Sequence, residues 1–392
     1  MSGTDARAVR HDFGRLPDLA ARRAGGSVVC ASDELFAEKE NLIKPEPASF
    51  AAYTFGHKGQ VYDGWETRRM RAAGSDWAII RLGLPGMVAG VVVDTAFFTG
   101  NYPPEISVEG CGVEGYPGPA ELAAADWQPL VPRSAVAGDS VNEFEVAGGW
   151  RVTHVRLSMY PDGGIARLRV HGVAVPDPRL LRGGLVDIAA LANGAQVTGC
   201  SNMFYSSPSN LISPGEARNM GEGWETARRR DDANDWVEIR LAAPGVVRLA
   251  ELDTSHFIGN APGWAAVGGR GPGTAAVPDT GAQPGWIALL PHTRLQPDTP
   301  HRFRVDGAAE VTEARLDVYP DGGMARLRLP AALTAAARDQ LALRWFNLLP
   351  EAQAAAVLAG TGAGSGAGAV LSARPLTSVT ELPAALQARL AG

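Results

Sequence analysis

Short runs of branched and aromatic residues, bounded by Gly, Pro or Asp, dominate the chain up to Pro330. In one of these runs apolar and polar positions alternate, so the side chains of Arg167 and Arg169 would face one way and those of Leu168 and Val170 the other. Such alternation is typical of a half-buried antiparallel strand. The pattern predicts strands at Trp77–Leu82, Val91–Phe98, Ile106–Glu109 and Ala166–His171.

The pattern changes after Pro330. Residues 331–359 are rich in Ala, Leu, Gln and Arg at helical spacing, residues 360–368 are almost entirely Gly, Ala and Ser, and residues 382–390 again favour a helix. We therefore predict a short helical C-terminal tail that contains a flexible linker.

The part before this tail is a duplication. Asp63-Gly-Trp-Glu-Thr returns as Glu222-Gly-Trp-Glu-Thr, and Tyr160-Pro-Asp-Gly-Gly returns as Tyr319-Pro-Asp-Gly-Gly, both 159 positions later. The Asn-Leu-Ile motif that begins at Asn41 returns 169 positions later, so the second copy is ten residues shorter before its Trp motif. A length difference of this kind marks a surface loop.

The Tyr-Pro-Asp-Gly-Gly segments are predicted to be tight hairpin turns, because Pro fixes φ and Gly permits positive φ. Regular short strands with such turns favour one β-sandwich in each copy. We expect an all-β protein with the divisions 1–24 (N-terminal extension), 25–183 (first repeat), 184–330 (second repeat) and 331–392 (helical tail).

Composition narrows the class of protein. The net charge is −6 and only three lysines are present, Lys39, Lys44 and Lys58, so nothing indicates a nucleic-acid partner. No apolar stretch is long enough to span a membrane. Three scattered cysteines and the lack of an apolar leader segment favour a cytoplasmic protein without disulfides. A small-molecule partner is the expectation.

The Trp motif has a structural and a functional interpretation. Trp65 and Trp224 suit apolar anchors, and the following arginines suit a solvated strand face. Alternatively, Glu66 and Glu225 are acid–base groups or metal ligands, and the arginines bind a substrate carboxylate in a bidentate manner. The candidate arginines are Arg68, Arg69, Arg71, Arg228, Arg229 and Arg230, of which Arg68, Arg71, Arg228 and Arg230 are our substrate-binding candidates.

A second pair of motifs places an acidic residue at the end of an apolar run. Asp94 and Asp253 either fix a loop by hydrogen bonds or face a ligand at the open end of the sandwich. His256 occupies the position of Phe97 in the first copy. An imidazole can exchange protons near neutral pH, whereas the phenyl ring in the first copy cannot. We therefore predict that the second repeat supplies the proton chemistry, with His256 and Asp253 as catalytic residues.

No spacing of His or Cys indicates a zinc site. Carboxylates that come together only in the folded chain leave no recognisable spacing in the sequence. A hard divalent metal ion bound by such carboxylates therefore remains open as a cofactor. Its ligands would come from Asp94, Asp253, Glu66 and Glu225.

With both copies aligned, the chain resembles the allantoicase family, whose members convert allantoate and water to ureidoglycolate and urea in purine degradation. The resemblance spans residues 25–330 and rests on the Asn-Leu-Ile motifs, both Trp motifs, both Asp-Thr motifs and both Tyr-Pro-Asp-Gly-Gly segments. It implies two jelly-roll modules of the galactose-binding-like type and a homo-oligomer. Asn41 and Asn210 of the Asn-Leu-Ile motifs join the substrate-binding candidates.

A weaker resemblance concerns the tail. The segments beginning at Arg344 and Ala373 look like the opening of the decarboxylase that acts earlier in the same pathway, but they are too short to hold its catalytic part. We interpret them as a structural remnant or a docking helix.

The resemblance predicts that arginines of the Trp motifs bind the allantoate carboxylate, that acidic residues near 66, 94, 225 or 253 move protons, and that His256 assists the leaving urea. The sequence leaves open whether an imine forms first or a metal-activated water attacks. The rival hypotheses are a non-catalytic sugar- or small-ligand-binding protein, with Trp264 and Trp286 as aromatic contacts, and a scaffold that only oligomerises.

Overall fold

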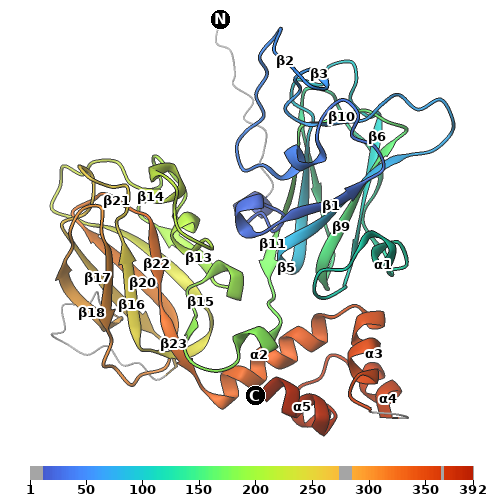
Figure 1. The fold of residues 1–392 in the computed structure, drawn as a ribbon. Coiled ribbons are helices and arrows are strands. Elements are labelled where there is room, and N and C mark those ends of the chain that lie inside the picture. Colours follow the sequence, from blue (N-terminus) through green and yellow to red (C-terminus); the bar gives the residue numbers. More distant parts are fainter. Residues whose placement is uncertain (1–11, 273–284, 363–365, 392) are drawn as a thin grey trace, which may run out of the picture. The chain divides into compact units, whose positions relative to one another are not determined.

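The chain forms two compact units, each built mainly from β-strands (Figure 1). The computed structural model describes residues 12–272, 285–362 and 366–391. Unit 1 comprises Met1–Val173 with Leu348–Ala356, and unit 2 comprises Ala174–Asn347 with Val357–Gly392. The prediction of two tandem all-β modules with a short helical tail is confirmed.

The main sheet of unit 1 is antiparallel. Its strands follow the order β1 (Ser27–Ala31), β5 (Asp76–Asp94), β9 (Arg151–Tyr160), β6 (Glu105–Cys111) and β7 (Gln128–Ala135), and both β8 (Val141–Glu145) and β11 (Arg167–Ala174) pair with β5. Two small ladders pair β2 (Phe55–Gly56) with β3 (Gly59–Gln60) and β4 (Trp65–Glu66) with β10 (Gly164–Ile165). Helix α1 (Pro119–Ala123) and the 3-10 helix η3 (Lys39–Ile43) lie in the connections.

Unit 2 has a similar arrangement of strands, but they are divided between a larger sheet and a three-stranded sheet. The larger sheet has the order β12 (Val186–Asp187), β23 (Pro330–Leu333), β15 (Asp235–Val247), β20 (Val311–Tyr319), β17 (Trp264–Arg270) and β18 (Ile287–Arg294), with β13 (Gln196–Cys200) paired to β15. A three-stranded sheet contains β19 (Pro300–Arg304), β16 (Leu249–Asp253) and β22 (Arg326–Arg328). The small ladder pairs β14 (Trp224–Glu225) with β21 (Gly323–Met324).

The strand β5 corrects the predicted strand pattern. The separate strands expected at 77–82 and 91–98 are one continuous strand, whose first half pairs with β9 and whose last residues pair with β8. The strand ends at Asp94, and the following residues form a turn in which Phe97 has a φ of 68°. In unit 2 the corresponding path is interrupted between β15 and β16.

The two faces of β11 are both covered. Leu168 and Val170 are fully buried, as the alternation predicts for one face. On the other face, however, the Arg167 side chain is also buried, with 1% of the residue exposed. A guanidinium can be buried to this extent only where its N–H groups have hydrogen-bond acceptors. Arg167 donates to the backbone carbonyls of Glu46 and Asp63.

The Tyr-Pro-Asp-Gly-Gly segments are turns, but the hairpin prediction is wrong. Strands β9 and β10, on either side of the first turn, belong to different sheets, so the turn carries the chain from the main sheet to the β4–β10 ladder. Gly163 has a positive φ of 150°, as expected of a turn glycine. Gly164 serves another purpose, because a Cβ there would lie 2.1 Å from the buried ring of Phe98.

The described residues of the tail form the α-helices α2 (Ala335–Leu348), α3 (Glu351–Ala359), α4 (Ala367–Ser372) and α5 (Ala384–Ala391). The predicted start of the helical region at residue 331 is too early, because β23 continues to Leu333 within the sheet of unit 2. The start of α3 lies with unit 1, where Gln353 Nε2 donates to Glu114 Oε1 over 2.7 Å. No helix among the described residues is long and apolar enough to cross a membrane.

Candidate active site

The two Trp motifs make the same contacts in both units. Trp65 and Trp224 are completely buried. The indole Nε1 of Trp65 donates to the carbonyl of Asp33, and that of Trp224 donates to the carbonyl of Asn202, each over 2.8 Å. The tryptophans therefore anchor the segments that follow β1 and β13, which is the structural interpretation of the motif.

The glutamate after each tryptophan accepts a hydrogen bond from an asparagine. Asn101 Nδ2 donates to Glu66 Oε1, and Asn260 Nδ2 donates to Glu225 Oε1, both over 2.6 Å. Glu66 is buried, and its Oε2 has no hydrogen-bond partner among the described residues. Burial raises the pKa of Glu66, and the Asn101 hydrogen bond offsets this only in part. Glu225 is half-buried.

The acidic residues of the Asp-Thr motifs fix turns. Asp94 Oδ1 accepts from the backbone N–H of Ala96, and Asp253 Oδ1 accepts from that of Ser255, each over 2.8 Å. This contact is the loop-fixing role that the sequence offered as one of two interpretations.

The asparagines of the Asn-Leu-Ile motifs also have matching roles. Asn41 Nδ2 donates to the carbonyl of Gly64 and Asn210 Nδ2 to that of Gly223, both over 2.8 Å. These bonds tie each motif to the residue that precedes the tryptophan. Contacts that occur in both units reflect their common fold, so a difference between the units is the better guide to function.

Two buried arginines were not among the site residues predicted from the sequence. Arg167 and Arg326 occupy equivalent positions and donate to the carbonyls of Asp63 and Glu222, at 2.8 and 2.7 Å respectively. In unit 1 the guanidinium also forms an ion pair of 2.7 Å with the Asp63 carboxylate. An arginine in an alternating strand gives no sequence signal that separates a buried role from an exposed one.

The predicted carboxylate-binding arginines differ in their partners and in their exposure. Arg68 is bound to Asp33 through both its Nε and its Nη2, at 2.7 Å each. The arginine at position 229 forms ion pairs with Asp231 and Asp235. The remaining candidates, Arg69, Arg71, Arg228 and Arg230, are exposed.

His256 occupies the same turn position as Phe97. Both residues have a left-handed backbone, with φ of 73° and 68°, and the N–H of each donates to an aspartate over 2.7 Å. The imidazole is exposed, and its Nε2 lies 2.8 Å from the carbonyl of Ala217. The structure thus places His256 on the surface of unit 2, in a turn whose backbone conformation is shared with unit 1.

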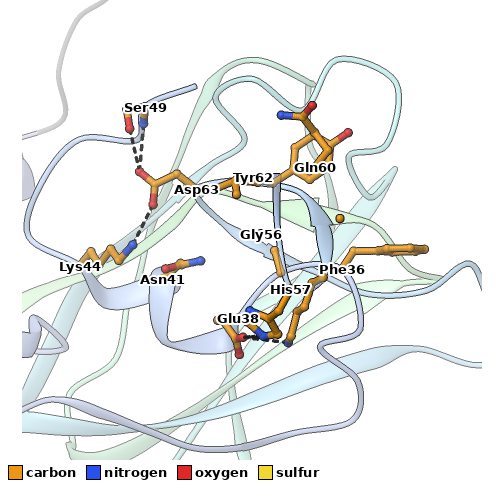
Figure 2. A pocket seen from close by; sticks show the side chains of 14 residues that line it. Phe36, Glu38, Asn41, Lys44, Ser49, Gly56, His57, Gln60, Tyr62 and Asp63 are labelled. Atoms are coloured by element: carbon orange, nitrogen blue, oxygen red, sulfur yellow. Dashed lines mark hydrogen bonds and ion pairs between the residues drawn. The ribbon is translucent and has the colours of Figure 1, made fainter. Parts of the chain in front are cut away.

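A local difference between the repeats is the loop that precedes the Trp motif, which is ten residues longer in the first repeat. In unit 1 this loop runs from residue 44 to residue 63 and contains the β2–β3 hairpin, with His57 and Lys58 at its tip. A cavity of about 390 Å³ lies between the hairpin and η3 (Figure 2). It is lined by Phe36, Ala37, Glu38, Asn41, Lys44, Ser49, Gly56, His57, Lys58, Gly59, Gln60, Val61, Tyr62 and Asp63.

Charged groups lie on opposite sides of this cavity. On one side, Lys44 Nζ is 3.1 Å from Asp63 Oδ1, as Figure 2 shows. On the other side, Glu38 Oε1 is 3.1 Å from Lys58 Nζ and 3.4 Å from His57 Nε2. Although burial opposes ionisation of Asp63, hydrogen bonds from Arg167, Lys44 and Ser49 outweigh it and lower the pKa of this carboxyl.

A second cavity of about 620 Å³ adjoins the first, and Phe36, His57 and Lys58 line both. Its wall also includes Arg68. Of the predicted substrate-binding residues, Asn41 therefore lines one of these cavities and Arg68 the other.

Unit 2 has a shorter loop at the equivalent place. Residues 213–222 contain no strand, and Arg218 pairs with Glu222 through both its side chain and its backbone N–H. The hairpin and its tip residues are therefore specific to unit 1.

The sequence left open a metal site with ligands from Asp94, Asp253, Glu66 and Glu225. Within the described residues, the set of acidic side chains whose oxygens lie within 4.8 Å of one another is a different one, Glu34, Glu38 and Glu40. Lys39 already pairs with Glu34 and with Glu40, at 3.1 Å each, so this cluster carries its own counter-charge.

Comparison with known protein families detects the same two repeats. A sequence model of the allantoicase repeat matches residues 17–175 and again residues 186–334. The chain belongs to the allantoicase family. The family resemblance inferred from the motifs is confirmed.

The similarity to other allantoicases covers nearly their whole length. The protein named probable allantoicase in Nocardia farcinica is 58% identical over 326 residues, which are 82% of this chain and 96% of that protein. Its counterpart in Streptomyces coelicolor is 49% identical over 353 residues, covering 87% and 92%. The crystal structure of allantoicase from Saccharomyces cerevisiae matches with a TM-score of 0.68 and 33% identity, covering 81% of this chain and 93% of that one.

Sequence reasoning missed the tip of the unit 1 hairpin. His57 was not among the candidate residues, although the fold brings it beside Glu38. Two signals could have identified this segment. One was the ten-residue length difference between the repeats, and the other was the restriction of all three lysines of this allantoicase to residues 39–58.

Proposed function

We propose that this chain catalyses the hydrolysis of allantoate to ureidoglycolate and urea. The observation that carries the proposal is the 58% identity to the Nocardia farcinica allantoicase over 96% of that protein, which includes both repeats. At this identity and coverage the chain retains the whole family architecture.

We further propose that the reaction takes place in the hairpin cavity of unit 1. Allantoate carries one carboxylate and two ureido groups on a single carbon. The cavity offers ammonium groups for the carboxylate, and the carboxylates of Glu38 and Asp63 can accept hydrogen bonds from ureido N–H groups. Asn41 and Gln60 add amide groups of the same kind as the ureido group. A small polar substrate therefore meets complementary partners on several walls of one cavity.

Hydrolysis needs a group that removes a proton from water and a group that delivers one to the leaving nitrogen. In the balanced reaction the C–N bond to one ureido group breaks, a C–O bond to water forms, and the proton lost by water is returned to urea. His57 is suited to both transfers, because its Nε2 lies 3.4 Å from Glu38, which can orient the ring and stabilise its charged form. In a route through an imine, the retained ureido nitrogen first loses a proton while the leaving urea gains one. Water then adds to the C=N bond, and its proton returns to that nitrogen.

The catalytic roles predicted from the sequence for His256, Asp253, Glu225, Asp94 and Glu66 stay predictions. The last four hold turns or asparagines in the structure, and these contacts do not by themselves exclude a part in proton transfer. A divalent metal as cofactor likewise stays a proposal.

The alternative of a sugar-binding protein is not favoured. Of its two aromatic candidates, Trp286 is only 5% exposed, so it offers no platform for a ligand. Trp264 is more exposed, but its ring is stacked on His292 with 4.9 Å between the ring centres.

The purified protein should release urea from allantoate in stoichiometric amounts with ureidoglycolate. Absence of urea at high protein concentration would refute the proposed activity. The same assay after exhaustive treatment with a chelator tests whether a bound metal ion is needed for activity. Full activity would rule out a metal-activated water, whereas loss that is restored by one added divalent ion would support it.

A cytoplasmic location and a homo-oligomeric state are also proposed, on the family resemblance and on the free state of Cys30, Cys111 and Cys200. Cell fractionation tests the first. Light scattering on the purified chain tests the second, and a monomeric mass at micromolar concentration would contradict it.

A further inference from the structure

The lysines of this chain are restricted to one place. The sequence contains 36 Lys and Arg residues together, of which only Lys39, Lys44 and Lys58 are lysines. Outside residues 39–58 the cation that pairs with a surface carboxylate is an arginine, as in Arg133 with Glu105. Lysine differs from arginine in presenting a compact ammonium with three rotatable donors, which fits a confined pocket better than a planar guanidinium does.

These three lysines differ in how fully their charge is compensated. Lys39 pairs with two carboxylates, those of Glu34 and Glu40. Lys44 pairs with Asp63, a carboxylate that it shares with Arg167.

Lys58 is the more enclosed of the two lysines that pair with a single carboxylate, since its side chain is less exposed than that of Lys44. Its Nζ donates to the carbonyl of Glu34 over 2.6 Å and lies 3.1 Å from Glu38, a carboxylate that it shares with His57. Its side chain is only 24% exposed. An ammonium has three N–H donors, so among the described residues one donor of Lys58 is left for a ligand.

The hairpin fixes Lys58 in position. The β2–β3 ladder pairs Phe55 with Gln60 and Gly56 with Gly59, which leaves His57 and Lys58 as the two residues of the turn. Gly59 has a φ of 100°, the left-handed conformation that tight turns require and that glycine adopts without strain. The bond from Lys58 to the Glu34 carbonyl then holds the tip against the segment that precedes η3, where both cavities meet.

Arg68, the substrate-binding candidate that lines the second cavity, is already engaged. Its Nε and Nη2 bind one oxygen of Asp33, and its backbone N–H binds the other. Capture of a substrate carboxylate by Arg68 would require this pair to break, whereas Lys58 can add a partner without losing one.

We propose that Lys58 is the residue that binds the carboxylate of the substrate, and that the β2–β3 hairpin is present in unit 1 to position it. This inference rests on the proposed function of the hairpin cavity. It also assigns to unit 1 a specificity-determining residue for which the shorter loop of unit 2 has no counterpart.

The test compares Lys58→Met with Lys58→Arg, using Arg133→Met as the matched control that removes an exposed, carboxylate-paired cation from the same unit. Loss of a charge-assisted hydrogen bond predicts that Lys58→Met raises the KM for allantoate at least tenfold, with a smaller effect on kcat. Lys58→Arg should recover part of the affinity, and Arg133→Met should keep the wild-type KM. A KM for Lys58→Met within twofold of wild type would overturn the proposal.

Two inhibitors separate binding from a structural role. Glycolate carries a carboxylate, and methylurea carries a neutral ureido group. Lys58→Met should weaken inhibition by glycolate and leave inhibition by methylurea unchanged. Equal weakening of both would mean that the cavity has collapsed, and this would also overturn the assignment.

Failure of the proposed function gives a different result. If the wild-type protein releases no urea, calorimetric titration with allantoate still measures binding. Equal affinity of the wild type and Lys58→Met would then refute the role of Lys58 independently of catalysis.

Discussion

His57 and His256 are both exposed imidazoles, but their surroundings differ. His57 faces a carboxylate at the junction of two cavities, whereas the Nε2 of His256 faces a backbone carbonyl on unit 2. A carboxylate stabilises the charged ring that forms during proton transfer, and it does so more strongly than a neutral carbonyl.

The substitutions His57→Asn and His256→Asn form a matched pair, because asparagine tolerates the left-handed backbone at position 256. We expect His57→Asn to lower kcat for urea release by about 100-fold, as is typical for loss of a general acid–base group. The effect at position 256 should be much smaller. A large loss for His256→Asn with an unchanged melting temperature would instead support the proton chemistry predicted for the second repeat.

Glu66 gives a prediction for the pH dependence of stability. Burial raises its pKa above the ordinary 4.5, so the folded state holds this proton more tightly than the unfolded chain does. The resulting stabilisation is complete below pH 4.5 and is lost as the pH rises through the raised pKa. Glu66→Gln should therefore increase the free energy of unfolding by about 1 kcal/mol at pH 7, with little difference from wild type at pH 4.

Chemical denaturation at both pH values checks this, with Glu225→Gln as the control because Glu225 makes the same asparagine contact while less buried. Lower stability of Glu66→Gln at pH 7 would contradict the account. A sharp loss of activity without a loss of stability would support the catalytic role predicted for Glu66.

At the scale of elements, the buried arginines determine the shape of the loop before each Trp motif. Arg167 donates to the carbonyls of Glu46, Asp63 and Ala166 and pairs with the Asp63 carboxylate. Removing Arg167 deprives these carbonyls of their donor and leaves Asp63 with Lys44 as its cation.

Arg167→Met should therefore lower the free energy of unfolding by about 3 kcal/mol and weaken allantoate binding as the cavity wall loosens. Arg69→Met removes an exposed arginine and should change stability by less than about 0.5 kcal/mol. Urea denaturation of the two variants measures the difference. Equal stability of both would show that the arginine network contributes nothing to the fold.

The sequence was sufficient to predict the duplication, the β-rich modules and the helical tail, because repeated motifs and period-two alternation depend on local patterns alone. It was not sufficient to join residues 77–82 and 91–94 into one strand, since continuity across the intervening glycines depends on pairing with β8 and β9. Burial of Arg167 could not be predicted either, because its acceptors lie in a loop about a hundred residues earlier in the chain.

For the whole molecule, the two units share a scaffold and differ in a loop. Matching contacts of Trp65 with Trp224, and of Asn41 with Asn210, show that the shared residues support the fold in both units. The hairpin of residues 44–63 adds a cavity with the positively charged Lys44 and Lys58 in unit 1. The length difference predicted a surface loop, but the position of its tip beside Glu34 and Glu38 depends on tertiary contacts.

The most direct test replaces residues 44–63 with the sequence of residues 213–222, so that unit 1 carries the loop of unit 2. The flanking motifs are the same in both repeats, and Arg326 shows that a loop of this length satisfies the buried arginine. The measurement is kcat/KM for urea release from allantoate, with the melting temperature recorded alongside. We predict a folded protein whose kcat/KM falls at least 1000-fold, about 4 kcal/mol of transition-state stabilisation. Wild-type turnover by this variant would contradict the assignment of the active site to unit 1.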